Sequence, residues 1–207
     1  MVQLLTPVVK AFLTDEGFNN ANAGLQVLGG AGFTTDWPLE QLVRDGRIPR
    51  IYEGTNGIQA MDLVGRKLGL GGGRLVAGVF ELLENYTRDN AGAPHVGEVA
   101  AALATLRSAT DRIATHGLED PEQAGAAATP YLRLVALVVI GYLWSRMAAA
   151  AQSGLEESGG YEPLLEGKLV SARYYFDKVL PEIDWLVKDI SSGKQSMMAL
   201  SDDQWVV

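Results

Sequence analysis

Residues 134–145 read Leu-Val-Ala-Leu-Val-Val-Ile-Gly-Tyr-Leu-Trp-Ser and form the most apolar stretch of the chain. Arg133 precedes this stretch and Arg146 follows it. A helix that crosses a membrane needs roughly 20 consecutive apolar residues. The stretch between the two arginines is shorter than that. It therefore predicts a buried core helix and no membrane span.

The segments on both sides of this stretch have helical character. Helical spacing of apolar residues predicts further helices in the second part of the chain. Pro181 lies inside the last of these helices and is expected to end or kink it near Leu180. Short polar or Gly/Pro turns separate the segments, which indicates an antiparallel bundle. The predicted helices cover residues 74–90, 94–115, 121–153 and 162–192.

The first part of the chain also predicts helices. One long helix runs from Val2 to about Leu28, and the glycines that follow it should stop it. A short second helix opens with Asp36 as its N-cap and Pro38 in its first turn. The third helix begins near Asn56 and runs to about residue 68. Asn56 and Gln59 have the spacing of a capping box, with Asn56 as the cap and Gln59 able to reach back to its backbone.

The whole pattern predicts an all-α fold. Residues 69–73 contain four glycines in five positions, which is typical of a linker. We therefore predict one helical unit over residues 1–68, a Gly-rich linker over 69–73 and a second helical unit over 74–207.

Composition excludes several classes of function. The formal net charge of −8 argues against nucleic acid or an anionic membrane as the main partner. The chain has no cysteine, which excludes disulfides and thiol chemistry and fits a reducing compartment. His95 and His116 lack partners at metal-ligand spacing, so we expect surface histidines and no metal site. The N-terminus shows no secretory signal, and we expect a cytoplasmic protein.

Three short motifs are candidates for chemistry. Taken alone, each has a structural interpretation: a glycine pair ends a helix, an Arg-Asp pair forms a surface ion pair, and a Glu before a glycine is simply exposed or favoured by a helix dipole. The motifs are Gln26-Val27-Leu28-Gly29-Gly30, Arg44-Asp45-Gly46-Arg47-Ile48 and Ile51-Tyr52-Glu53-Gly54-Thr55-Asn56-Gly57-Ile58-Gln59.

In this order and spacing, the motifs resemble the last conserved blocks of the acyl-CoA dehydrogenase family. That family shows a QxxGGxG(F/Y) turn, a YPVE-like helix start followed by RDxRI, and IYEGT(S/N)xIQ. Residues 36–40 fill the YPVE position, and the resemblance covers residues 4–68. Residues 172–182 and 196–200 resemble the C-terminal extension of the subgroup that includes 3-methylmercaptopropionyl-CoA dehydrogenases.

The resemblance implies an FAD-dependent desaturation of acyl-CoA thioesters to trans-2-enoyl-CoA. Glu53 is then the catalytic base, and its own backbone N–H is a donor to the thioester oxygen. Tyr52 and Gly54 would contact the substrate. Thr55, Asn56 and Gly57 would meet the FAD pyrophosphate at a helix N-terminus.

The resemblance also implies partners. Gln26, Val27, Leu28, Gly29 and Gly30 would approach the adenosine-diphosphate part of an FAD bound mainly by a neighbouring subunit, which requires a homodimer or a higher homo-oligomer. The electron acceptor would be electron-transferring flavoprotein or a similar protein.

Only part of the family's structure is recognised in this chain. No segment matches the middle β-domain or the earlier half of the C-terminal four-helix domain, so the isolated chain is expected to be inactive. The extension should serve packing and subunit contact. The alternative is a helical interaction or oligomerisation module, derived from the family, that is not catalytic. A change to other flavin chemistry, such as nitroalkane oxidation, ranks lower because Glu rather than Asp stands at position 53.

Overall fold

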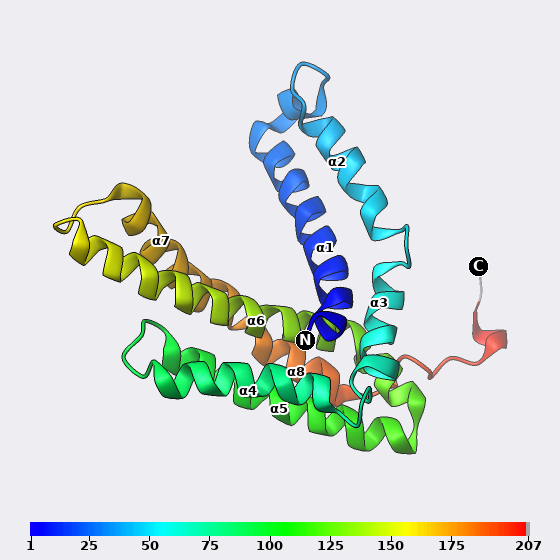
Figure 1. Cartoon of the computed structure of the whole chain (residues 1–207). Coiled ribbons are helices and arrows are strands. Elements are labelled where there is room, and N and C mark those ends of the chain that lie inside the picture. The colour runs from blue at the N-terminus through cyan, green and yellow to red at the C-terminus, as the bar shows by residue number, and fades with distance from the viewer. Residues whose placement is uncertain (206–207) are drawn as a thin grey trace.

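The computed structural model describes residues 1–205, and the regular structure in that range is entirely helical (Figure 1). The predicted all-α fold is therefore confirmed. Short 3-10 segments cover Gly29–Phe33, Ile48–Arg50 and Asp202–Gln204, and π-helical turns cover Leu63–Lys67 and Tyr175–Val179. The α-helices are α1 Val2–Leu28, α2 Leu39–Arg47, α3 Asn56–Asp62, α4 Arg74–Asp89, α5 Val96–Glu119, α6 Pro121–Glu157, α7 Pro163–Tyr174 and α8 Glu182–Ser192.

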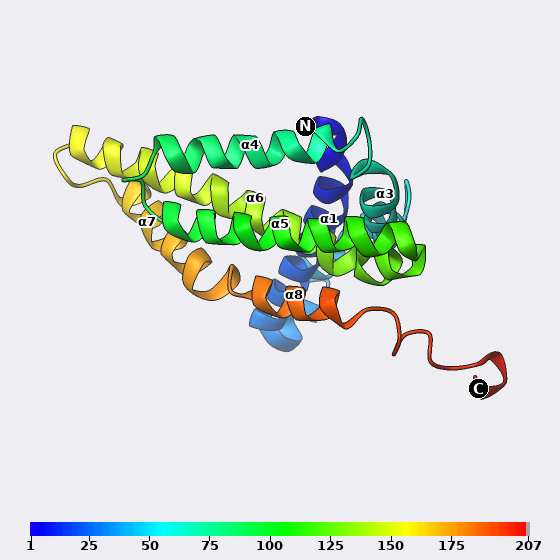
Figure 2. The same cartoon turned by 90° about the horizontal axis from the view of Figure 1, so that it is seen from below.

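Helix α6 is the centre of the molecule. It is 37 residues long and begins at the predicted Pro121, but it runs past the predicted end to Glu157. By length and composition α6 could cross a membrane. However, 56% of its most apolar window is buried against other helices, among them α5, α7 and α8 (Figure 2). This burial supports the interpretation of the apolar stretch as a core helix.

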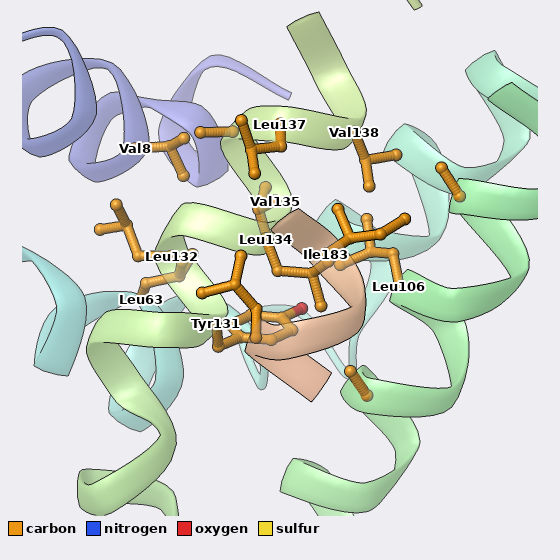
Figure 3. Packing of buried hydrophobic residues seen from close by; sticks show 14 of the residues in the cluster. Val8, Leu63, Leu106, Tyr131, Leu132, Leu134, Val135, Leu137, Val138 and Ile183 are labelled. Carbon is orange, nitrogen blue, oxygen red and sulfur yellow. The ribbon is translucent and has the colours of Figure 1, made fainter. Parts of the chain in front are cut away.

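One cluster of buried side chains surrounds α6. Tyr131, Leu134 and Val138 of α6 are completely buried. Figure 3 shows Val8 from α1 and Ile183 from α8 among the side chains that gather around them. The cluster therefore includes residues on both sides of the glycine-rich segment 69–73. The division of the chain into two domains at this segment stays a prediction.

Helices α1 and α2 form a hairpin that projects away from the bundle (Figure 1). The buried residues of α1 all lie in its first half, up to Phe12. Its second half contacts α2 and the turn at Gly29–Phe33, and every residue of α2 is at least partly exposed. Val27 and Phe33 near the tip are 85% and 76% exposed. Only the base of the hairpin is therefore fixed by hydrophobic burial.

Arg133 of α6 binds that base to the rest of the bundle. Its Nη1 donates to Oε1 of Glu16 in α1 at 2.6 Å, and its Nη2 donates to Oε2 of Glu182 in α8 at 2.9 Å. Its guanidinium carbon also lies 5.3 Å from the centre of the Phe12 ring. The hydrogen bonds to Glu182 and Glu16 raise the pKa of Arg133 above its ordinary value. One side chain thus joins three helices that are distant in sequence.

Two predicted helix caps are wrong. Asp36 does not cap α2: a turn from Thr34 to Trp37 moves the helix start to Leu39, and Thr34 Oγ1 donates to the Asp36 carboxylate at 3.5 Å. Asn56 does not cap α3, because its side chain is bonded to α1.

Two other expectations have different outcomes. The helical segment breaks as predicted at Leu180 and Pro181, between the π-turn Tyr175–Val179 and α8.

His95 is not a plain surface residue. Its ring is partly buried and stacks on Phe176, with ring centres 4.2 Å apart and planes inclined by 10°.

Replacing Arg133 with Met should lower the free energy of unfolding by about 1–3 kcal/mol, because Glu16 and Glu182 lose their charged partner. The residue is about one-third exposed, so solvent limits the loss. Chemical denaturation followed by circular dichroism measures it. The control is Arg146→Met in the same helix, where the guanidinium donates to Tyr142 one turn earlier. Equal effects of the two substitutions would contradict the role of Arg133.

Buried phenols should make the fold sensitive to alkali. Burial raises the pKa of Tyr131 and of Tyr175 above their ordinary value of 10.0. Above pH 10 the unfolded chain loses these protons before the folded chain does, so stability falls as pH rises. The denaturation midpoint should decrease from about pH 9 to about pH 11, a range of roughly one pH unit on either side of the ordinary tyrosine pKa. Tyr175→Phe should flatten the decrease, whereas replacing the exposed Tyr161 with Phe should leave it unchanged.

Candidate active site

Glu53 occupies a strained turn between the 3-10 segment Ile48–Arg50 and α3. Its φ is +55°, in the left-handed region, and Gly54 follows with φ +85°. A left-handed backbone at a residue other than glycine costs of order 1–3 kcal/mol, and such residues cluster at functional sites. The Glu53 side chain is exposed. The turn therefore presents a carboxylate to the outside at a cost in local conformation.

Contacts within the segment give the turn its shape. The Tyr52 N–H donates to the Ile48 carbonyl at 3.2 Å. Nε2 of Gln59 reaches back from α3 and donates to the Glu53 carbonyl at 3.1 Å. Oγ1 of Thr55 accepts from the Ile58 N–H at 3.4 Å and caps α3. These contacts join residues near one another in sequence, so they fix the shape of the turn rather than its position.

Contacts with α1 fix the position of the turn after Glu53. Nζ of Lys10 donates to the Gly54 carbonyl at 2.7 Å and to Oδ1 of Asn56 at 2.8 Å. Nδ2 of Asn56 donates to the Ala11 carbonyl at 3.1 Å and to Oγ1 of Thr14 at 3.0 Å. Both ends of the Asn56 amide are thus used on α1. What Asn56 can still offer a ligand is its main chain.

A second contact with α1 lies before Glu53. Nε of Arg50 is 2.5 Å from Oδ1 of Asp15, and the Arg50 guanidinium carbon lies 4.9 Å from the centre of the Phe18 ring. The turn is therefore attached to α1 on both sides of Glu53. Sequence reasoning missed Lys10, Asp15 and Arg50. The one available signal was a single cation at Lys10 within an otherwise apolar part of the first predicted helix.

Gly54 is required by the turn itself. A Cβ at this position would lie 2.9 Å from Nε2 of Gln59, besides the left-handed φ. The family resemblance implied that Gly54 is small because the substrate passes close to it. That contact stays a prediction, but the backbone gives an independent reason for the glycine.

The predicted flavin-binding residues lie in two places. Thr55, Asn56 and Gly57 are beside Glu53 at the start of α3. The stretch from Gln26 to Gly30 is at the far end of α1, sixteen residues beyond Lys10, which is about 24 Å along a helix. This chain therefore does not bring the two groups together. Their shared role with a neighbouring subunit's FAD stays a prediction.

The chemistry that this arrangement can perform is that of a carboxylate base. Within residues 1–205, His, Asp and Glu side chains form no group of three or more that could hold a metal ion. The Glu53 carboxylate is exposed on the turn that leads into the start of α3. A base fixed in place beside main-chain donors is suited to removing a proton from carbon next to a carbonyl group.

Substituting Gly54 with Ala should lower the free energy of unfolding by about 1 kcal/mol or more, because Ala meets Gln59 and resists the left-handed φ. Gly57→Ala is the matched control. A Cβ at Gly57 meets nothing within 4 Å, and Ala favours the helix, so stability should be unchanged or slightly higher. Urea denaturation of both variants measures the difference. Gly54→Ala as stable as Gly57→Ala would show that the turn differs from the one described.

Two family models match the chain. Residues 2–68 match "Acyl-CoA dehydrogenase, C-terminal domain". Residues 77–201 match "Acetyl-CoA dehydrogenase C-terminal like". Together they include the Glu53 turn and the helices of the extension.

Full-length relatives extend the match. The chain is 33% identical over 206 residues to 3-methylmercaptopropionyl-CoA dehydrogenase of Ruegeria pomeroyi, covering 97% of the chain and 35% of the relative. It is 30% identical to the broad-specificity linear acyl-CoA dehydrogenase FadE5 of Mycobacterium tuberculosis, covering 96% and 34%. A butyryl-CoA dehydrogenase of Syntrophomonas wolfei is 25% identical over all of the chain and 35% of its own length. The chain thus spans about a third of these relatives, and it belongs to the acyl-CoA dehydrogenase family, with the C-terminal helical domain and the extension of that family.

Proposed function

We propose that this chain contributes the base, Glu53, to an FAD-dependent acyl-CoA dehydrogenase that converts acyl-CoA thioesters to trans-2-enoyl-CoA. The observation that carries the proposal is the strained turn. The turn carries a carboxylate on a residue with a left-handed backbone, and it is attached to α1 before Glu53 through Arg50 and after Glu53 through Gly54. Family membership supplies the type of reaction.

The chemistry places two demands on the chain. The α-proton of a thioester is too weakly acidic for an ordinary carboxylate unless the negative charge on the thioester oxygen is stabilised as it forms. The chain must therefore hold Glu53 against the α-carbon and offer a donor to that oxygen. The Glu53 carboxylate takes the proton, and its own main-chain N–H donates to the thioester oxygen.

The start of α3 is the proposed site of the flavin pyrophosphate. Thr55 is the N-cap of α3 and Gly57 lies in its first turn, where helix N–H groups lack partners within the helix. A Cβ at Gly57 would meet nothing within 4 Å, so the surface there is open to a ligand. FAD bound there would supply the acceptor for the β-hydride. The residues of this chain supply Glu53 as the base, and the main-chain N–H groups of the turn and of the start of α3 as donors.

Further segments are needed to complete the site. Apolar side chains on the hairpin of α1 and α2 are exposed, with Leu13 at 55%, Phe33 at 76% and Trp37 at 48%. The side chain of Glu53 is exposed as well. We propose that segments outside these residues cover the hairpin and close the site, and that residues 1–207 alone do not turn over. Homo-oligomerisation, a cytoplasmic location and an electron-transferring flavoprotein as acceptor belong to the same proposal.

The second candidate is a helical interaction module without catalysis. The exposed apolar surface of the hairpin favours this function, since such surfaces mark contacts with other proteins. A packing module, however, has no need of a carboxylate in a costly conformation at position 53. Glu53 is therefore the residue that separates the two candidates.

Replacing the matching C-terminal third of the Ruegeria pomeroyi relative with residues 1–207 tests the function. Flavin bleaching is followed without oxygen after addition of 3-methylmercaptopropionyl-CoA or butyryl-CoA. We expect bleaching, and we expect Glu53→Gln to slow it by about 10²-fold or more, because the base is lost.

The control for this test is Glu119→Gln. Glu119 ends α5 and is exposed, and this variant should bleach at the original rate. A graft that binds flavin and bleaches equally fast with Gln at position 53 would contradict Glu53 as the base. A folded graft that fails to bind flavin or substrate would favour the interaction module.

A further inference from the structure

One ammonium group connects α1 to the Glu53 turn. Nζ of Lys10 donates to the carbonyl oxygen of Gly54, immediately after Glu53, and to Oδ1 of Asn56 at the start of α3. The two distances are 2.7 and 2.8 Å, and both contacts are partly buried. Lysine has three donors and no acceptor, so two of its three donors are used on the turn.

This connection differs in kind from the local contact made by Gln59, and it adds to the contacts that Asn56 and Arg50 make with α1. Gln59 is six residues from Glu53, and its hydrogen bond preserves the shape of the turn wherever the turn moves. Lys10 is 44 residues from Gly54, and it defines where the turn lies relative to α1. Charge-assisted hydrogen bonds are also roughly twice as strong as neutral ones. Lys10 therefore fixes a position that local contacts leave open.

The contact acts on the strained part of the backbone. The oxygen that Lys10 binds belongs to Gly54, whose φ is +85°, and the residue before it is Glu53 at +55°. Rotation of either residue out of the left-handed region would carry this oxygen away from the ammonium group. The strain at Glu53 persists only if the surroundings oppose such a rotation.

We infer that Lys10 is a positioning residue for the base: its ammonium group holds the Glu53 turn against α1 in the left-handed conformation. The inference rests on the proposed function of Glu53. Lys10 acts through the main chain of Gly54 and the side chain of Asn56. It makes no contact with the reacting atoms, and its loss should displace the base rather than remove it.

A purely structural role for Lys10 predicts something different. The base of α1 is held to the bundle by buried apolar residues, among them Leu4 and Val8, and by the ion pair of Glu16 with Arg133. These contacts do not involve Lys10. Asn56 and Arg50 still contact α1 without Lys10. Loss of the ammonium group should thus loosen the turn at Gly54 while α1 stays packed, whereas loss of a structural residue would loosen α1 as well.

The absence of cysteine allows a direct test on the whole chain. Lys10→Cys introduces a single thiol, which 2-bromoethylamine converts into a close analogue of lysine and iodoacetamide converts into a neutral side chain. Hydrogen exchange is then measured for the amides of residues 58 and 59, which donate to Thr55 at the start of α3, and for amides of residues 4–12. We expect exchange at 58 and 59 to rise about 10- to 100-fold in the neutral form and to return towards the original rate in the aminoethylated form, because the segment that supplies Thr55 has lost its attachment to Lys10.

The control is Lys188→Cys, on the exposed face of α8, treated with the same two reagents. It should leave exchange at 58 and 59 unchanged. If Lys10→Cys does not fold, Lys10→Met keeps the apolar stem and replaces it in the same measurement. Unchanged exchange at 58 and 59 in the neutral form, or a rise of the same size at 4–12, would overturn the inference.

Kinetics of the flavin-binding graft provide the second measurement. Lys10→Met should lower the rate of flavin bleaching at saturating acyl-CoA by about 10-fold or more and leave KM nearly unchanged, because the bound substrate then faces a displaced base. Lys10→Arg, which keeps a positive charge, should restore part of the rate. A rise in KM alone would overturn the inference. The exchange measurement does not depend on catalysis, so it separates failure of this inference from failure of the proposed function.

Discussion

The ion pairs of Arg133 hold α1 in place, and the Glu53 turn is built on α1. Glu16 of α1 and Glu182 of α8 share this one guanidinium, which lies over the Phe12 ring. Beyond Phe12, α1 has no fully buried residue, so this contact is the last firm attachment before the hairpin leaves the bundle. A shift of α1 at this point would move Lys10, Asp15 and the other α1 groups that the turn contacts, because a helix moves as a rigid body.

Two neighbouring acidic residues of α1 face different parts of the molecule. Asp15 pairs with Arg50, just before the turn, and Glu16 pairs with Arg133 in the core. A single helical turn thus connects the Glu53 turn with α6 and α8 of the extension. The extension was expected to serve packing and subunit contact. Its helices also support, through α1, the position of Glu53, the residue that we propose as the base.

The sequence predicted the parts of the structure that depend on local pattern. The apolar stretch 134–145, the helices around it and the break at Pro181 follow from hydrophobic spacing and from the missing N–H of proline. Asp36 and Asn56 failed as caps because other contacts changed where a helix starts or used the side chain. Glu53 was found only through a family resemblance. Lys10 gave only the signal of an isolated cation in an apolar part of its helix, and its role was missed because its partners are 44 and 46 residues away.

The residue at position 53 is itself an argument for function. A left-handed backbone favours glycine, or asparagine among the other residues, and glutamate gains nothing from it. Its side chain is exposed, so burial does not repay the strain. The surrounding contacts through Lys10, Arg50 and Gln59 stabilise the turn, but they bind the main chain and neighbouring residues, and a glycine at 53 would keep them all. A sequence selected only for stability would therefore not place glutamate there. A carboxylate that opposes the local preference, on a turn fixed from both sides, indicates a side chain that is kept for its chemistry.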